Sequence, residues 1–143
     1  MVSVPEVNLN SGKVIPTIGL GFWLTPEDQA ANIAYEGLNA GYRLLDSARI
    51  YKNEQGVING IARWLAEDPE HRHRADVFYT TKIYDTEHGY SETKAALNNS
   101  IEKAKKIGYI DLVLVHSPQS NYEKRHGTWM ALQEAVDSGK VKS

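Results

Sequence analysis

The chain has 143 residues, of which 41% are hydrophobic and 24% charged, a composition that fits one soluble globular domain and argues against disorder. Its net charge of -2 gives no strong field to attract nucleic acid or an anionic membrane, and no run approaches the roughly eighteen apolar residues that span a bilayer. It has no cysteine, which excludes disulfides, thiolate metal sites and cysteine nucleophiles, and which suits the cytoplasmic location that we expect.

The first predicted elements are a small hairpin, a short strand and a helix. Residues 7–9 and 14–15 lie on either side of the turn-forming residues 10–13, which predicts a hairpin over 7–15. Residues 18–21 are predicted to form the short strand. Thr25 is a suitable N-cap for the helix that follows, and Pro26 suits its first helical position. Gly41 can take the left-handed conformation that ends this helix.

Three further strand and helix pairs follow. The predicted strands are 43–46, 77–82 and 110–116, and the predicted helices are 53–67, 91–107 and 125–138. In the last helix we expect Trp129, Leu132 and Val136 to form the buried stripe. Strands that alternate with helices indicate βαβ units, and therefore parallel strands joined by right-handed crossovers. Two architectures remain open at this point, a doubly wound open sheet and part of a (β/α) barrel.

Ionisable residues end three of the predicted strands. Asp46, Lys82 and His116 each close an apolar run, and Tyr51 lies in the loop just after the second strand. In a barrel of parallel strands these ends gather at one rim, where catalytic groups of that fold reside. Adjacent strands lie about 4.8 Å apart, so side chains at neighbouring ends can touch.

These four side chains suit proton transfer to a carbonyl oxygen. Lys82 and Asp46 would pair, because each is costly to bury alone, and the ammonium would stabilise the anion of Tyr51. A neutral His116 would hold the carbonyl oxygen by a hydrogen bond. No side chain supplies hydride, so the chemistry requires a nicotinamide or a flavin.

Each of the four residues also has a structural explanation when it is taken alone. Asp46 can cap a turn, Lys82 can be a strand-end lysine that extends to solvent, His116 can be a satisfied core histidine, and Tyr51 can be an ordinary loop aromatic. Their coincidence at three successive strand ends favours the catalytic interpretation.

Residues 41–54 resemble the signature of the aldo-keto reductases. The resemblance extends over the whole chain and includes residues 19–23, the pair Thr81-Lys82 and residues 116–118. It implies the N-terminal half of a (β/α)8 TIM barrel, about four βα units preceded by a β-hairpin. It also implies an NADP(H)-dependent oxidoreductase, of the alcohol dehydrogenase (NADP+) kind, that acts on a small-molecule carbonyl or polyol.

The resemblance assigns roles to particular residues. The catalytic residues would be Asp46, Tyr51, Lys82 and His116, with Tyr51 as general acid in reduction and as base in oxidation. The cofactor-binding residues would be Gly21, Phe22, Trp23 and Asp46. The substrate-binding residues would be Trp23, Ile50, Tyr84, His116 and Ser117. We expect no metal ion, and Glu54 would be the structural glutamate of the family.

Two positions of the substrate pocket differ from those of many family members. Aromatic bulk is common after the catalytic lysine and histidine, whereas this sequence has Tyr84 and Ser117 there, which favours a roomier pocket. Arg49 either adds a positive charge near the rim or is an exposed loop arginine, and the second is the commoner case.

A complete barrel of this kind needs about 250 residues. We therefore expect residues 1–143 to be a partial barrel, with 140–143 as the approach to a fifth strand and with the remainder of the barrel and of the cofactor site absent. Such a chain would have unpaired edges on its first and fourth strands and helices on one face only. It would be incomplete as an enzyme, or alternatively a non-catalytic half-barrel that self-associates or binds the missing C-terminal half.

Overall fold

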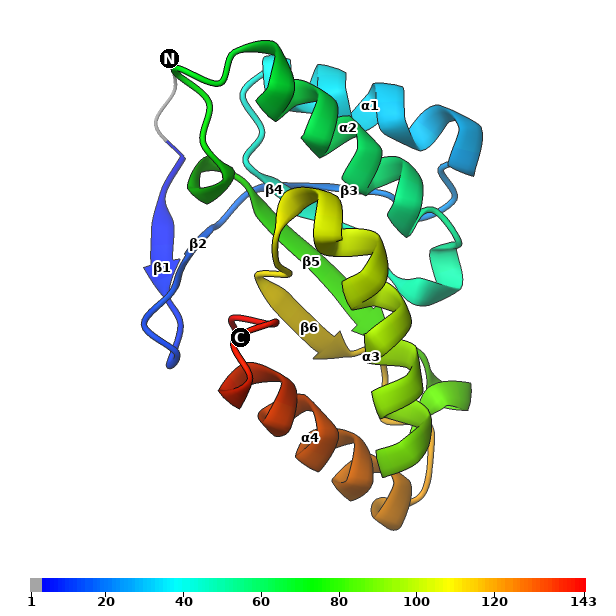
Figure 1. Cartoon of the computed structure of the whole chain (residues 1–143). Helices are drawn as coiled ribbons and strands as arrows, with labels where there is room; N and C mark the ends of the chain where they lie inside the picture. The colour runs from blue at the N-terminus through cyan, green and yellow to red at the C-terminus, as the bar shows by residue number, and fades with distance from the viewer. Residues whose placement is uncertain (1–3) are drawn as a thin grey trace.

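The computed structural model describes residues 4–143 and contains a four-stranded parallel sheet, four α-helices and a separate β-hairpin (Figure 1). The hairpin pairs β1 (Glu6–Asn8) with β2 (Val14–Pro16). The parallel strands are β3 (Gly19–Gly21), β4 (Leu44–Asp46), β5 (Phe78–Ile83) and β6 (Leu112–Val115), in chain order across the sheet. The helices are α1 (Glu27–Asn39), α2 (Glu54–Glu67), α3 (Tyr90–Ala104) and α4 (Tyr122–Asp137). Short 3-10 helices are η1 (Arg49–Tyr51), η2 (Arg74–Asp76), η3 (Asp85–Glu87) and η4 (Lys105–Ile107).

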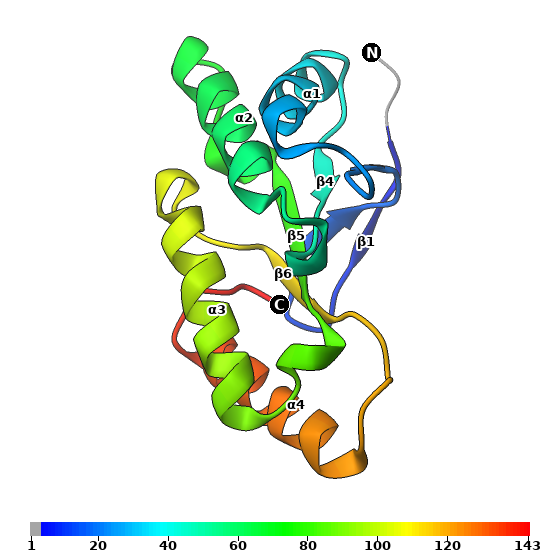
Figure 2. The same cartoon turned by 90° about the vertical axis from the view of Figure 1, so that its right-hand side faces the viewer.

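The helices pack on one face of the sheet (Figures 1 and 2). Successive strand residues point to opposite faces, so Leu45 and Tyr79 are fully buried in the core that the helices cover. On the opposite face Asp46 and Lys82 are half-buried and Leu114 is exposed. Strand order that follows chain order is that of a barrel segment, whereas a doubly wound sheet reverses its order.

Two helix predictions were wrong in detail. Pro26, not Thr25, is the N-cap residue of α1, and no side chain caps the helix; the Pro26 carbonyl instead accepts from the backbone of Gln29 and Ala30. In α4 Trp129 is 57% exposed, so it does not belong to the buried stripe. The helix presents small residues to α3 instead. Gly127 lies so close to Tyr90 that a Cβ on Gly127 would be 2.7 Å from the Tyr90 backbone nitrogen.

The end of the chain lies along β6. Val141 forms a parallel bridge with Ile110, and the backbone nitrogen of Val113 donates to the Ser143 carbonyl at 3.0 Å. Residues 140–143 therefore begin to pair as a fifth strand would, and the edge of the fourth strand is not fully unpaired as the sequence suggested. In the part of the chain that the structure describes, no helix combines the length and apolarity needed to cross a membrane.

Helices α1 and α2 approach closely through glycine. A Cβ on Gly60 would lie 2.4 Å from the Ala31 carbonyl oxygen and 2.6 Å from the Ala34 Cβ. Ala31 and Ala34 belong to α1, and neither its backbone nor a buried methyl can turn aside as the end of a long side chain can. The small residues thus set the distance between the two helices.

We predict that Gly60→Ala destabilises the chain by about 1–3 kcal/mol through overpacking, although alanine is the better helix former by about 1 kcal/mol. Chemical denaturation monitored by circular dichroism would measure the change. Ala66→Gly, at an exposed position of α2, is the matched control for helix propensity alone. A Gly60→Ala chain that gains stability would show that the α1–α2 distance is not set by this glycine.

Candidate functional site

Lys82 is the centre of the candidate site, at the carboxyl end of β5. Its Nζ forms an ion pair with Asp46 Oδ1 and donates to the Tyr51 hydroxyl at 3.1 Å and to the Ser47 carbonyl at 3.0 Å. The side chain of Lys82 is 12% exposed and that of Asp46 is 35% exposed. The ammonium therefore has three oxygen partners and no freedom to extend into solvent, which rules out the strand-end lysine interpretation.

Tyr51 is positioned by a tight turn. It ends η1, and Lys52 follows with a φ of +57°, in the left-handed region that non-glycine residues rarely adopt. The Tyr51 ring lies against Trp23, with centroids 4.9 Å apart and an interplanar angle of 58°. The turn thus directs the phenol toward the strand ends rather than into solvent.

His116 lies between two aromatic rings. Its ring meets Tyr51 edge-on at 5.6 Å and Tyr84 edge-on at 5.7 Å between centroids. Its Nδ1 is buried and has no hydrogen-bond partner among residues 4–143. Burial lowers the pKa of the imidazole and the Lys82 ammonium lowers it further, while Asp85 and Asp46 act in the opposite direction. The ring is therefore neutral near pH 7.

The structure places the remaining predicted site residues around these three. Gly21 pairs with Asp46 across the sheet and has open space where a Cβ would be. Trp23 is 58% exposed, whereas Phe22 is fully buried in the core, so the Phe22 side chain anchors its loop and cannot touch a bound molecule. Ile50 and Tyr84 are half-buried.

Sequence reasoning missed Asn53, which joins two of the loops at the site. Its fully buried amide donates to the carbonyls of Phe22 at 2.8 Å and Thr25 at 2.9 Å, and its carbonyl oxygen accepts from Ser47 at 2.7 Å. The sequence shows Asn53 only as a helix start, and nothing local in the sequence signals that the side chain turns back to the preceding loop.

Glu54 is buried behind the site. It is 2% exposed and accepts from Thr81 at 2.6 Å, Ser100 at 2.8 Å and Lys103 at 2.8 Å. These contacts join α2 to β5 and α3, directly behind the strand that carries Lys82. The geometry is that of a structural glutamate.

Neither sequence interpretation of Arg49 was right. Its side chain is 16% exposed and donates to Glu87 at 2.7 Å and 2.9 Å and to Ser100 at 3.0 Å. It therefore clamps η1 to η3 and α3, and its charge is matched by the Glu87 carboxylate. This arginine is neither an exposed loop residue nor a free positive charge at the rim.

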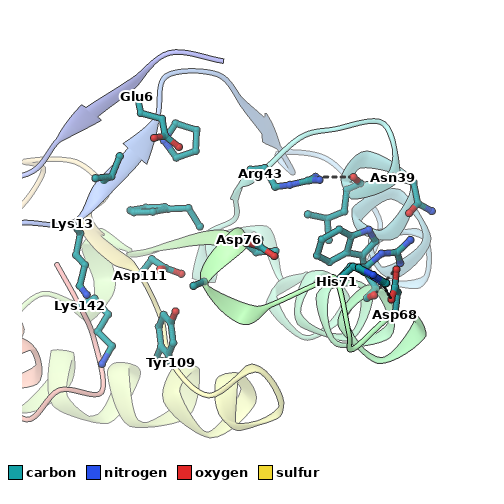
Figure 3. Close-up of a pocket in the computed structure, with 18 residues that line it drawn as sticks. Glu6, Lys13, Asn39, Arg43, Asp68, His71, Asp76, Tyr109, Asp111 and Lys142 are labelled. Atoms are coloured by element: carbon teal, nitrogen blue, oxygen red, sulfur yellow. Dashed lines mark hydrogen bonds and ion pairs between the residues drawn. The ribbon is translucent and has the colours of Figure 1, made fainter. Parts of the chain in front are cut away.

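A polar hollow of about 850 Å³ lies at the opposite, amino-terminal ends of the strands, beneath the hairpin (Figure 3). Most of its charged groups already have partners: Arg43 donates to the Leu38 carbonyl, and Asp68 pairs with His71. None of the predicted site residues lines it. Residues 4–143 also contain no cluster of three or more histidine, cysteine, aspartate or glutamate side chains suited to a metal ion.

Fold and site together define a segment of a (β/α) barrel with ionisable groups at its carboxyl rim. The chain matches the Aldo/keto reductase family over residues 17–143, and it belongs to that family. It is 46% identical over 135 residues to an uncharacterized oxidoreductase of Saccharomyces cerevisiae, an alignment that covers 94% of this chain and 48% of the yeast protein.

Solved structures confirm the fold that the sequence predicts. An aldo/keto reductase from Brucella melitensis matches with a TM-score of 0.89 and 38% identity, over 99% of this chain and 52% of that chain. An aldo-keto reductase of Bombyx mori in complex with NADP matches with a TM-score of 0.86 and 30% identity, over 100% of this chain and 50% of that chain. The chain spans about half the length of the curated relatives that it matches.

We predict that the His116 ring titrates with a midpoint below its ordinary value of 6.5. Because the folded-state pKa is lowered, the stability that the neutral ring contributes is complete above pH 6.5 and is lost as the pH falls through the folded-state pKa. A proton–carbon NMR titration of histidine-labelled chain would measure the midpoint. Lys82→Met should raise it, since a repelling charge is removed, and Lys106→Met on the exposed surface should not; a midpoint above 6.5 in the unmodified chain would contradict the assignment.

Proposed function

We propose that this chain carries the catalytic residues of an NADP(H)-dependent oxidoreductase that reduces aldehyde or ketone carbonyls to alcohols, or oxidises alcohols and polyols in reverse. The observation that carries the proposal is the Lys82 ammonium, which contacts the Asp46 carboxylate and the Tyr51 hydroxyl at once. Chemistry that needs a proton delivered from a phenol requires this kind of neighbour, because the phenolate left behind must be stabilised.

In the proposed reaction Tyr51 is the proton donor. Its hydroxyl gives a proton to the carbonyl oxygen as that oxygen gains negative charge, and the Lys82 ammonium, 3.1 Å away, stabilises the phenolate. Asp46 holds the ammonium in place. In the oxidative direction the phenolate accepts the proton of the alcohol, as microscopic reversibility requires.

His116 orients the carbonyl. A neutral ring that carries its proton on Nε2 leaves only a lone pair at the buried, unpartnered Nδ1, and it can donate from Nε2 to the substrate oxygen. The edge-on contacts with Tyr51 and Tyr84 fix the plane of the ring. The histidine therefore holds the carbonyl next to the proton donor without competing for its proton.

The residues at the rim fit a nicotinamide cofactor, which supplies the hydride when it is bound. Gly21 offers open space beside Asp46, and the exposed face of Trp23 adjoins it along the chain. We propose that Gly21, Trp23 and Asp46 hold the reactive end of NADP(H), as Phe22 anchors their loop. Since the relatives are about twice as long, we assign the contacts to the pyrophosphate and the 2′-phosphate to a C-terminal half.

The substrate pocket would be lined by Trp23, Ile50, Tyr84, His116 and Ser117. Ser117 is a small polar residue at a position where bulk is common in the family. Its hydroxyl donates to Asp85 at 2.6 Å. We propose a small carbonyl or polyol as substrate and a cytoplasmic location, both on the basis of the sequence.

A second candidate, a non-catalytic half-barrel that self-associates, is favoured by one observation. An apolar groove of about 520 Å³ lies between β6, α4 and residues 141–143, lined among others by Leu112, Leu114 and Trp129. Leu114 is 39% exposed and Trp129 57%. Covering such apolar surface is favourable, at roughly 25 cal/mol per Å².

The first function predicts the result of a chimera of residues 1–143 with the C-terminal half of the yeast relative. The chimera should oxidise NADPH with an aromatic aldehyde, and Tyr51→Phe should lower the rate by about 10²-fold or more while NADPH fluorescence quenching persists. Tyr122→Phe, at a 73% exposed position, is the matched control. A Tyr51→Phe chimera within a few fold of the parent would remove Tyr51 from the proposed role.

The second function predicts a concentration-dependent dimer of the 143-residue chain in sedimentation velocity. Leu114→Glu places a charge in the groove and should shift the chain to the 16.0 kDa monomer. Tyr122→Glu, outside the groove, should leave the dimer unchanged. If the unmodified chain is monomeric at every concentration, self-association is not its function.

A further inference from the structure

His88 is a buried histidine that the proposed reaction does not use. It follows η3 in the loop after β5, its side chain is fully buried, and it is not part of the main hydrophobic cluster. Its Nδ1 lies 2.7 Å from the Ser120 hydroxyl, and its Nε2 has no hydrogen-bond partner among residues 4–143. A buried ring with one polar atom unsatisfied costs free energy that an apolar residue would avoid. The Asp85 Oδ1 atom lies 3.9 Å from Nε2, beyond hydrogen-bond distance. The bond to Ser120 is therefore the one short polar contact that an apolar residue could not make at this position.

Ser120 belongs to the segment 116–120. The His116 backbone nitrogen donates to the Ile83 carbonyl of β5 at 2.9 Å, and side chains hold the residues that follow it. The segment lies between β6 and α4 and has no regular secondary structure. Ser117 donates to Asp85 at 2.6 Å, and Arg125 donates to the Pro118 carbonyl at 3.0 Å. Asp85 and His88, both in the loop after β5, therefore form hydrogen bonds with the segment that begins with His116.

His88 is itself fixed to the helices. The backbone nitrogen of the next residue, Gly89, donates to the Thr128 hydroxyl of α4 at 2.9 Å, and Thr128 also accepts from Thr93 of α3 at 3.0 Å. All three residues lie in the close α3–α4 contact. The imidazole is therefore a rigid point from which Ser120 can be held.

We infer that His88 is a positioning residue for His116, acting through Ser120 on the segment that carries His116 and Ser117. The inference rests on the proposed role of His116 at the site. The loop after β5 carries Tyr84, one of the two rings against which His116 packs, and His88 joins that loop to the segment 116–120. Without the bond, residues 117–120 lose one attachment while the His116 backbone stays bonded to Ile83, so the His116 ring can turn relative to Tyr84 and Tyr51. A displacement of about 1 Å is enough to impair a reaction.

Two substitutions of similar size separate the bond from the packing. An asparagine amide reaches the position of Nδ1, whereas a glutamine amide reaches that of Nε2. His88→Asn therefore keeps a partner for Ser120, and His88→Gln does not. Ser120→Ala removes the same hydrogen bond by changing its half-buried partner, and it leaves the imidazole of His88 in place.

The readout is the proton–carbon NMR spectrum of the 143-residue chain labelled in its five histidines. We expect His88→Gln and Ser120→Ala to shift the ring signals of His116 and its titration midpoint in the same direction, and His88→Asn to restore both. His126→Gln, an exposed change on α4, is the control that leaves His116 unaltered.

The inference is overturned if Ser120→Ala and His88→Gln lower the thermal stability but leave the His116 signals unchanged, because His88 is then only a packing residue. If the His88→Gln chain does not fold, the comparison of the His116 signals between the Ser120→Ala chain and the unmodified chain is the deciding test. The spectra require no turnover, so they can be interpreted even if the chimera fails to reduce aldehydes.

Discussion

The parallel register of β4 and β5 is the constraint on which the site depends. It pairs Asp46 with Thr80, so Lys82 lies two residues beyond the end of β4, on the same face as Asp46. From there the lysine side chain can meet the Asp46 carboxylate, the Ser47 carbonyl and the Tyr51 hydroxyl together. A shift of one residue would turn Lys82 to the helix-covered face, where no partner offsets its charge.

Buried polar side chains then fix the loops relative to the strands. Asn53 joins the loop after β3 to the one after β4, Arg49 joins η1 to η3, and Glu54 supports β5 from behind. Nearly every polar atom that these side chains bury has a hydrogen-bond partner. Buried polar groups that are paired in this way rigidify a structure, whereas unpaired ones lower its stability. Asp46 and Lys82 lie on strands, whereas Tyr51 and His116 lie on the segments that follow β4 and β6.

The two ends of the sheet have different tasks. The carboxyl ends carry the groups around Lys82 that we propose for proton transfer. The amino ends and the hairpin enclose a polar hollow whose charges are largely paired among themselves. The side faces differ again, since β6 and α4 leave an apolar groove next to residues 141–143. Separation of stability from chemistry along the strand direction is the general property of (β/α) barrels.

The alternation of strands and helices, the hairpin and the four ionisable residues could all be predicted from the sequence, because periodicity, glycine turns and charged ends of apolar runs are local signals. The sequence did not determine that Trp129 faces solvent, because the close α3–α4 contact through Gly127 decides which face of α4 is buried. Nor did it reveal the roles of Arg49, Asn53 or His88. Their partners Glu87, Phe22 and Ser120 lie 31 to 38 residues away along the chain, and only packing brings them within hydrogen-bond distance.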